Sequence, residues 1–266
     1  MIYILGSNGM LGRYVYDYLL YKCLYQVTGL TRNDIDAGNL TEARNKLENI
    51  IKSGDVVINC MGITNKRPDL SLNEMYMVNS IFPHIIDRIC QRKQAQLIHP
   101  STDCVFTGKV GNYDLNAIKD EESDYGLSKS IGENLYGSVI RVSIIGEEER
   151  RQTGLLSWCQ KNTNKIVNGF TNHFWNGVTC LQWAKLVDKI IRNKDFWQGV
   201  RVYQSKFKGE NFVSKANLVR YISEIYNLNI DVVDTETKLN NKTLRGEVVD
   251  KDLTEQIKEM YDYRWG

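Results

Sequence analysis

The chain lacks the patterns of several specialised protein classes. Its six cysteines include no C-x-x-C pair and its three histidines form no H-E-x-x-H pattern, so we expect neither a metal site nor a disulfide framework. No apolar run approaches the roughly 18 residues that cross a membrane. No leader is recognisable either, and we therefore expect a cytoplasmic location and no membrane partner. Internal repeats and low-complexity segments are absent as well.

Charge of either sign is not in excess. The 34 basic and 32 acidic residues leave a formal net charge of +2, and the basic residues are scattered along the chain. This balance gives no reason to expect a nucleic-acid partner. With 266 residues, of which 42% are hydrophobic and 25% charged, the composition is that of a globular chain with room for one large domain and a smaller addition.

The first residues combine a strand, a glycine loop and a helix. A short apolar run of strand formers leads into glycines at a G-x-x-G-x-x-G spacing (residues 6–12), and a segment with helical periodicity follows. This is the context that a dinucleotide-binding motif requires. Gly6 would permit the tight turn, Gly9 would let the backbone approach a pyrophosphate, and Gly12 would let the helix pack on the strand. The free amides of the helix N-terminus would face the phosphates.

Strands and helices alternate after this motif. Buried strands are expected at 26–31, 55–62, 95–100 and 138–143, with helices at 41–51 and 72–93 between them. Thr41 or Asn39 is the candidate cap of the first of these helices. This alternation predicts an α/β fold with a Rossmann-like, doubly wound parallel sheet and a smaller C-terminal α/β lobe. We expect the dinucleotide-binding domain to comprise 1–145 and 178–204, and the substrate-binding lobe to comprise 146–177 and 205–266.

The end of the second expected strand should select the cofactor. An acidic residue there usually binds the ribose 2′-hydroxyl of NAD, whereas an arginine accommodates the 2′-phosphate of NADP. Arg32 follows this strand directly, and Asp34 and Asp36 lie close behind it. The sequence therefore predicts a preference for NADPH, and the two acidic residues leave NADH as an alternative.

A threonine, a tyrosine and a lysine are the candidate catalytic residues. Thr102 follows the strand expected at 95–100, at the edge where open α/β sheets bind their ligands. Tyr125 and Lys129 share one face if their segment is helical, because positions i and i+4 are neighbours. A nearby cation lowers the pKa of a phenol by about one to three units, which makes Tyr125 a candidate proton donor. The spacing alone equally fits a solvated helix face.

Three motifs in order carry a family resemblance. The glycine loop, the Ser101-Thr102-Asp103 segment and the Tyr-Gly-x-Ser-Lys-x-x-Gly-Glu run at 125–133 resemble the extended short-chain dehydrogenase/reductases, and within them the dTDP-4-dehydrorhamnose reductase group. The resemblance covers about residues 1–190. It implies reduction of a nucleotide-linked 4-keto-6-deoxyhexose in deoxysugar synthesis. It also implies that Tyr125 donates the proton, that Lys129 tunes it and holds the nicotinamide ribose, and that Thr102 binds the substrate oxygen.

The binding residues fall into two sets. Besides Tyr125 and Lys129, the residues expected around the cofactor are Gly6, Asn8, Gly9, Met10, Leu11, Gly12, Arg32, Asp34, Ile35, Cys60, Met61, Gly62 and Asn79. The residues expected around the nucleotide sugar are Thr64, Asp103, Val105, Phe106, Trp175 and Arg245. Trp175 belongs to an aromatic, amide-rich loop at 168–177 that suits a sugar ring, and Arg245, in the polar and basic segment 240–245, could meet a diphosphate. A buried anchor and a solvated loop are their respective alternatives.

Two departures from the resemblance leave alternatives open. Ile144 stands where rhamnose-forming reductases usually carry a tryptophan that packs on the sugar, which leaves the identity of the sugar open. Cys104 stands where GDP-fucose synthases and plant and viral epimerase/reductases carry a proton-shuttling cysteine. The protein is then either a simple reductase in which Cys104 only packs, or a bifunctional 3,5-epimerase/4-reductase. A non-catalytic, NADP-binding regulatory subunit is an alternative of another class, and a homodimer is a further expectation.

Overall fold

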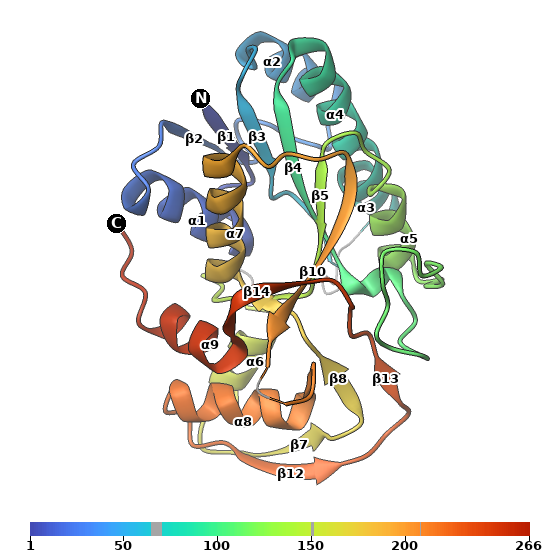
Figure 1. The fold of residues 1–266 in the computed structure, drawn as a ribbon, viewed down its shortest axis with the longest axis vertical. Helices are drawn as coiled ribbons and strands as arrows, with labels where there is room; N and C mark the ends of the chain where they lie inside the picture. Colours follow the sequence, from blue (N-terminus) through green and yellow to red (C-terminus); the bar gives the residue numbers. More distant parts are fainter. Residues whose placement is uncertain (65–70, 150–151, 208) are drawn as a thin grey trace.

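The computed structural model describes residues 1–64, 71–149, 152–207 and 209–266. Its centre is a sheet of seven strands in the order β14-β10-β5-β4-β3-β1-β2, and all neighbours in it are parallel. The predicted doubly wound parallel sheet is therefore confirmed (Figure 1). Its strands are β1 (Ile2–Leu5), β2 (Val27–Leu30), β3 (Val56–Asn59), β4 (Gln96–Ser101), β5 (Ser138–Arg141), β10 (Gly199–Lys206) and β14 (Glu247–Asp252).

Helices cover both faces of this sheet, as its continuous apolar strands require. On one face lie α1 (Met10–Asp17), which continues into a π-helical turn at Tyr18–Lys22, and α7 (Cys180–Asn193). On the other face lie α2 (Leu40–Ile50), α4 (Phe82–Lys93) and α5 (Asp124–Ile131) (Figure 1). Two apolar cores result, one on each side of the sheet.

The strand order places a crevice beside the glycine loop. From β1 the chain moves outward to β2 and then returns to form β3 on the opposite side of β1. Such a reversal opens a crevice at the carboxyl ends of the two strands, and open α/β sheets bind their ligands there. The loop after β1 is the glycine loop, so the fold brings the predicted dinucleotide motif to this crevice.

The helix predicted at 72–93 is interrupted in its middle. It consists of α3 (Leu72–Tyr76), a π-helical turn at Met77–Ile81 and α4. Pro83 has no N–H to donate to the carbonyl of Asn79, four residues earlier, so an α-helical hydrogen bond is missing at this point. The freed carbonyl of Asn79 meets Gly132, where an added Cβ would lie only 2.1 Å from the oxygen. The wider turn thus lets α4 and the end of α5 approach closely.

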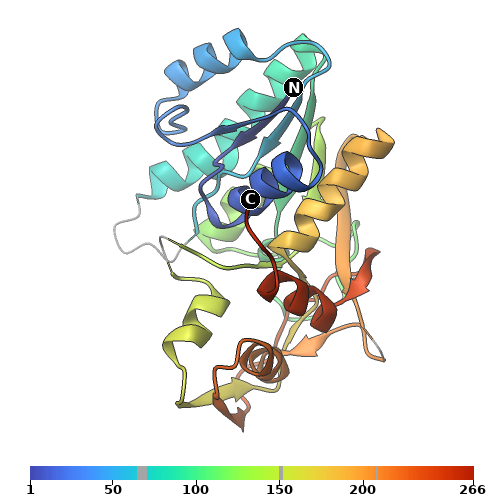
Figure 2. The same cartoon turned by 90° about the vertical axis from the view of Figure 1, so that its left-hand side faces the viewer.

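A smaller lobe of helices and short strands lies beyond the carboxyl edge of the sheet (Figure 2). Two of its strands, β7 and β8, occupy a segment predicted as loop. The elements outside the large sheet are α6 (Leu155–Lys161), α8 (Lys215–Ile225), α9 (Leu253–Tyr261), β6 (Ile144–Ile145), β7 (Ile166–Phe170), β8 (His173–Trp175), β9 (Val178–Thr179), β11 (Val213–Ser214), β12 (Asp231–Thr235) and β13 (Asn240–Asn241). The predicted domain boundaries stay a prediction, and we note that β14, assigned to the lobe, pairs with β10 in the large sheet.

The last residues return to α1 (Figure 2). The hydroxyl of Tyr263 donates to the carboxylate of Asp17 at 2.6 Å, and the ring of Trp265 packs on Tyr14 with 4.6 Å between centroids. This aromatic end therefore packs on the large domain of its own chain. Within the four described ranges of residues, no helix is both long and apolar enough to traverse a lipid bilayer.

Candidate active site

The glycine loop has the geometry that its predicted roles require. Gly6 adopts the left-handed region with φ of 77°, where side chains are strained. A Cβ on Gly12 would lie 2.1 Å from the carbonyl oxygen of Gly6, so only glycine allows α1 to pack this closely. Gly9 precedes α1, is exposed and provides no side-chain cap, and the first turn of α1 contains no acidic residue. These features fit a pyrophosphate bound by the free amides.

The loops after β1 and β3 meet at the crevice. An added Cβ on Gly6 would lie 3.0 Å from the side chain of Met61, which shows how closely the two loops approach. Gly62 is exposed, and Cys60 and Met61 are partly exposed. Of the remaining predicted cofactor contacts in the first loop, Asn8 is exposed, Met10 is partly buried and Leu11 is buried in the core.

Arg32 and Asp34, the charged residues that follow β2, already have partners in the structure. The guanidinium of Arg32, 59% exposed, pairs with Asp36 at 3.4 Å and with Glu74 at 3.2 Å. The carboxylate of Asp34 accepts hydrogen bonds from the backbone and hydroxyl of Thr31, both at 2.8 Å, and these lower its pKa. Asp34 therefore stabilises its own turn.

Ile35 follows in the same turn. Its side chain is buried in the core beneath α2. The turn after β2 directs this side chain inward, and the predicted place of Ile35 beside the cofactor stays a prediction.

Thr102 and Tyr125 lie together at the carboxyl end of β4. Thr102 follows β4, and its hydroxyl donates to Asp103 at 3.0 Å while it accepts from the backbone N–H of Cys104 at 3.1 Å. Tyr125 is in the first turn of α5, which Ser123 caps. The side chain of Thr102 also interacts with the Tyr125 phenol. The two hydroxyl groups can therefore reach one substrate oxygen.

The environment of Tyr125 favours the protonated phenol. Burial raises the pKa of Tyr125, and the nearby Cys104 and Asp103 raise it further, whereas the interaction with the Thr102 side chain lowers it. The predicted lowering of this pKa by Lys129 is wrong for the structure, because burial and the acidic neighbours dominate. A protonated phenol at neutral pH is nevertheless what a proton donor needs.

Lys129 is buried one helical turn after Tyr125. Its Nζ donates to the carbonyl oxygen of Pro100 at 2.9 Å and lies 3.5 Å from Nε2 of His99. Burial lowers the pKa of Lys129 to about 8, against the opposing charge of Glu133. Both charge states of Lys129 are thus accessible near neutral pH.

Asn79 lies beneath this site but its amide is fully engaged. Its Nδ2 donates to the carbonyl oxygen of Ile63 at 2.8 Å and to the hydroxyl of Ser128 at 3.1 Å. Its Oδ1 accepts from the backbone N–H of Ile63 at 2.9 Å. Asn79 is therefore placed to tie the loop after β3 to α5. Its predicted role as a direct cofactor contact stays a prediction.

Cys104 is a partly buried thiol in the same cluster. Its Sγ lies 3.5 Å from Oδ1 of Asp103. Burial raises the pKa of Cys104 to about 12, with a further contribution from Asp103 that outweighs the opposing charge of Lys242. A thiol with so high a pKa is a poor base near neutral pH. The geometry thus favours packing as the role of Cys104.

Three predicted substrate contacts have side chains in the core. A 3₁₀ turn at Asp103–Val105 directs Val105 and Phe106 inward, and Phe106 stacks on Tyr113 with 4.1 Å between centroids. Trp175 is 3% exposed, and its indole N–H donates to Ser143 at 2.8 Å. These three side chains therefore pack in the core, and their predicted place at the substrate stays a prediction.

The other predicted substrate residues differ in position. Asp103 is buried and holds Thr102, as described above. Thr64 is exposed after β3. The side chain of Arg245 is 60% exposed and forms an ion pair with Asp114 on the surface.

Lys242 is a site residue that the sequence prediction missed. It follows β13, and its Nζ pairs with Glu121 at 2.8 Å, with both side chains less than one-fifth exposed. The ammonium of Lys242 interacts electrostatically with Cys104 and Asp103. Lys242 therefore lies close to the catalytic cluster although it belongs to the smaller lobe. The polar segment 240–245 was the only signal, and it did not distinguish Lys242 from Arg245.

A buried ion pair supports the cluster from behind. Glu133 accepts two hydrogen bonds from Arg141, at 2.8 and 2.7 Å, and one from Ser101 at 2.6 Å. Lys119 lies 3.2 Å from the same carboxylate. Because Ser101 directly precedes Thr102, this pair fixes the end of β4.

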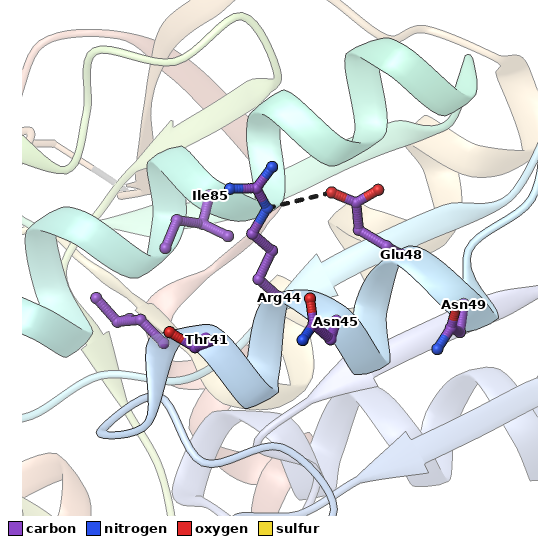
Figure 3. Close-up of a pocket in the computed structure, with 7 residues that line it drawn as sticks. Thr41, Arg44, Asn45, Glu48, Asn49 and Ile85 are labelled. Atoms are coloured by element: carbon purple, nitrogen blue, oxygen red, sulfur yellow. Dashed lines mark hydrogen bonds and ion pairs between the residues drawn. The ribbon is translucent and has the colours of Figure 1, made fainter.

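The hollow in Figure 3 lies elsewhere on the large domain. It has a volume of about 680 Å³ and lies between α2 and Ile85 of α4. Arg44 points toward Glu48 there and pairs with it at 3.2 Å. None of the candidate site residues lines this hollow.

Comparison with known proteins gives partial sequence matches. The dTDP-4-dehydrorhamnose reductase of Mycobacterium tuberculosis (strain CDC 1551 / Oshkosh) is 40% identical over 92 residues, which cover 32% of this chain and 30% of that protein. The enzyme of the same name from Aggregatibacter actinomycetemcomitans is 31% identical over 146 residues, covering 53% and 48%. The matched part thus spans less than half the length of these curated relatives.

Similarity of fold extends over the whole chain. The crystal structure of dTDP-4-dehydrorhamnose reductase from Bacillus anthracis str. Ames, in complex with NADP, superposes with a TM-score of 0.81 and covers 98% of both chains at 17% identity. The family model described as the RmlD substrate binding domain matches residues 1–146. Since this match covers more than half of the 266 residues, the chain belongs to the RmlD substrate binding domain family.

Proposed function

We propose that the protein is an NADPH-dependent reductase of a nucleotide-linked 4-keto-6-deoxyhexose in deoxysugar biosynthesis. The observation that carries the proposal is the meeting of Thr102 and Tyr125 at the carboxyl end of β4, with Lys129 one helical turn away. The strand order reverses beside the glycine loop, which is where open α/β sheets bind their ligands. The names of the curated relatives and the NADP in the Bacillus anthracis structure support the same activity.

The chemistry follows from the hydroxyl pair. A bound nicotinamide cofactor supplies the hydride that converts the ketone to an alcohol. As negative charge develops on the ketone oxygen, Tyr125 gives its proton to that oxygen, and the Thr102 hydroxyl turns from Asp103 to donate a hydrogen bond. Both interactions are stronger in the transition state than in the ground state, which is the condition for accelerating the reaction.

Turnover with defined substrates tests this proposal. The purified protein should oxidise NADPH in the presence of dTDP-4-dehydrorhamnose or a related nucleotide-linked 4-keto sugar, and should not do so with NADPH alone. Cofactor binding without turnover of any such sugar would instead support the non-catalytic, NADP-binding subunit.

Replacing Arg32 should reveal the cofactor preference. The Arg32→Ala variant is expected to bind NADPH about tenfold more weakly with unchanged affinity for NADH, because a charge-assisted hydrogen bond is worth about 1.5–3 kcal/mol. We expect a loss of binding free energy at the lower end of this range, because the guanidinium of Arg32 has to leave Asp36 and Glu74 to bind a phosphate. Fluorescence titration measures both dissociation constants, with Arg44→Ala on α2 as a matched loss of an exposed cation. Equal affinities of the parent protein for NADPH and NADH would refute the preference.

Replacing Lys242 should weaken the binding of the nucleotide sugar. The Lys242→Met variant is expected to raise KM about tenfold with a smaller change in kcat, because one charge-assisted contact to a diphosphate or sugar oxygen is lost. Arg245→Met is the matched control, since its guanidinium pairs with Asp114 on the surface. Steady-state kinetics of both variants decide between the two cations. A large effect for Arg245 alone would restore the assignment made from sequence.

The bifunctional alternative has one observation in its favour, the position of Cys104 beside Tyr125. The raised pKa of Cys104 argues against it. Turnover in heavy water separates the two activities, because epimerisation exchanges the hydrogens next to the ketone. We expect no deuterium at C3 or C5. Incorporation that disappears in Cys104→Ser would establish the epimerase.

A further inference from the structure

A buried chain of three side chains runs behind the candidate site. His99 lies on β4 and is 1% exposed, and Asn59 ends β3 and is fully buried. Nδ1 of His99 is 3.1 Å from Nδ2 of Asn59, and Nε2 is 3.5 Å from Nζ of Lys129. The mechanism above gives His99 no role, although it is the imidazole that faces the site lysine.

The orientation of Asn59 decides which nitrogen of His99 carries the proton. The backbone N–H of Met61 can only donate, and it lies 3.2 Å from Oδ1 of Asn59. The amide oxygen is thereby fixed toward Met61, and the NH₂ group faces His99. Because NH₂ donates, Nδ1 of His99 must accept, and a neutral imidazole then carries its proton on Nε2. Burial, together with the charge of Lys129, lowers the pKa of His99 well below its usual value and so keeps the ring neutral.

The N–H at Nε2 of His99 therefore faces Lys129. An ammonium group has three donors and no acceptor, so it gains nothing from this N–H, whereas an uncharged amine accepts it through its lone pair. We propose that Asn59 holds His99 as the Nε2–H tautomer, and that His99 acts as a positioning residue that stabilises the uncharged form of Lys129.

Other groups around Lys129 act on the same equilibrium. The carbonyl of Pro100 on β4 accepts from Nζ in either charge state. The carboxylate of Glu133 favours the ammonium, but Arg141 of β5 and Lys119 pair with it and weaken this effect.

Among the described residues, the other neighbours named by these interactions bring no opposing negative charge. His84, on α4, lowers the pKa of His99 further, which keeps the ring neutral. Tyr125, on α5 itself, is a neutral phenol, as shown above. Among the described groups packed around Lys129, His99 is therefore the hydrogen-bond donor that favours the uncharged amine over the ammonium.

The consequence for catalysis rests on the proposed reductase function. Once Tyr125 has given its proton to the substrate oxygen, its phenolate has to be protonated again before the next turnover. The ammonium of Lys129, a buried acid one helical turn away, gives a proton to the phenolate and becomes an uncharged amine. The amine later regains a proton from water. By stabilising the amine, His99 makes this loss of a proton easier.

Nuclear magnetic resonance of protein with ¹⁵N-labelled histidine tests the tautomer without cofactor, substrate or turnover. Long-range ¹H–¹⁵N couplings separate the two tautomers, and His99→Gln assigns the signal among the three histidines. We expect a neutral Nε2–H ring on both sides of neutral pH. A neutral Nδ1–H ring or an imidazolium in the parent protein would overturn the inference, whether or not the protein proves to be a reductase.

The Asn59→Asp variant provides the reciprocal test. A carboxylate accepts from both Met61 and Nδ1–H, so the ring should change to the Nδ1–H tautomer and Nε2 should accept from the ammonium. The midpoint of Lys129, followed by its ¹³Cε signal, should rise by about one to three units. Asn79→Asp adds a buried charge beside Ser128 without contacting His99 and serves as the control. An unchanged tautomer in Asn59→Asp, or an equal rise in Asn79→Asp, would contradict the role of Asn59.

An active enzyme adds a kinetic readout. In Asn59→Asp, the limb of the pH profile of kcat that reflects Lys129 should shift to higher pH. The shift should match the rise in the titration midpoint of Lys129. A loss of rate without this movement would show that His99 has only a structural role.

Discussion

Tyr125→Phe should bind NADPH as tightly as the parent protein and lose about 10²- to 10⁴-fold in kcat, the usual contribution of a positioned general acid. The ring that packs in the first turn of α5 is retained, and only the hydroxyl that meets Thr102 is lost. Burial raises the pKa of this phenol, so the parent donor is protonated at neutral pH. Cofactor affinity and turnover, measured separately, distinguish a missing proton donor from a damaged binding site.

A matched control for this variant lies on the neighbouring helix. The hydroxyl of Tyr76 donates to Asp124 at 3.2 Å, at the start of α5. Tyr76→Phe therefore removes a hydroxyl that contacts the same helix outside the catalytic cluster, and kcat should change less than about twofold, as for most surface substitutions. Undiminished turnover in Tyr125→Phe would mean that another group donates the proton.

Glu133→Ala should lower the free energy of unfolding by about 3–5 kcal/mol, because it leaves a buried charge without its partner. The substitution strands the guanidinium of Arg141, which is 3% exposed, and removes the acceptor of Ser101. Denaturation with urea measures the change. The matched control is Asp234→Ala, which breaks the exposed pair with Arg220 and should cost less than about 1 kcal/mol. A comparable small cost for Glu133→Ala would show that the buried pair contributes little.

The same pair predicts how stability depends on pH. Burial raises the pKa of Glu133, but hydrogen bonds from Arg141 and Ser101 and the charge of Lys119 lower it overall. A carboxyl group whose folded pKa is lowered stabilises the protein above its unfolded pKa, and this contribution is lost as the pH falls through the folded pKa. Glu133→Ala should therefore lose less stability on acidification than the parent protein.

The parts of the fold that depend on local sequence were predictable. The strand, glycine loop and helix at residues 2–17 follow from spacing and from the conformational freedom of glycine. Of the two cap candidates, Thr41 and Asn39, it is Asn39 that caps α2, because its side chain accepts from the backbone N–H of Glu42, the third residue of the helix. The position of Thr102 at the carboxyl end of β4 also follows from the alternation of strands and helices.

The inward or outward direction of single side chains was not predictable. Val105 and Phe106 follow Thr102 directly, yet one 3₁₀ turn directs both into the core. Trp175 was predicted in a loop, but β8 pairs with β11 and β13 and buries it. Such directions depend on strand pairing between segments that are distant in sequence.

Ion pairs between residues that are distant in the sequence could not be predicted for the same reason. Lys242 and Glu121 are 121 positions apart and no pattern in the sequence links them. The effect of Lys129 on Tyr125 was predicted from their spacing on one helix face, but burial of the phenol, with Cys104 and Asp103 beside it, raises the pKa of Tyr125 instead. Desolvation is a property of the folded site, and helix spacing alone does not report it.

Transfer of deuterium from NADPH labelled at C4 of the nicotinamide tests the central claim most directly. The alcohol formed from dTDP-4-dehydrorhamnose, or from a related nucleotide-linked 4-keto sugar, should carry one deuterium at its C4 carbon, as mass spectrometry and NMR would show. Product formed without deuterium at C4, or no product from any such sugar while NADPH binds, would contradict the account of this protein as a ketone reductase.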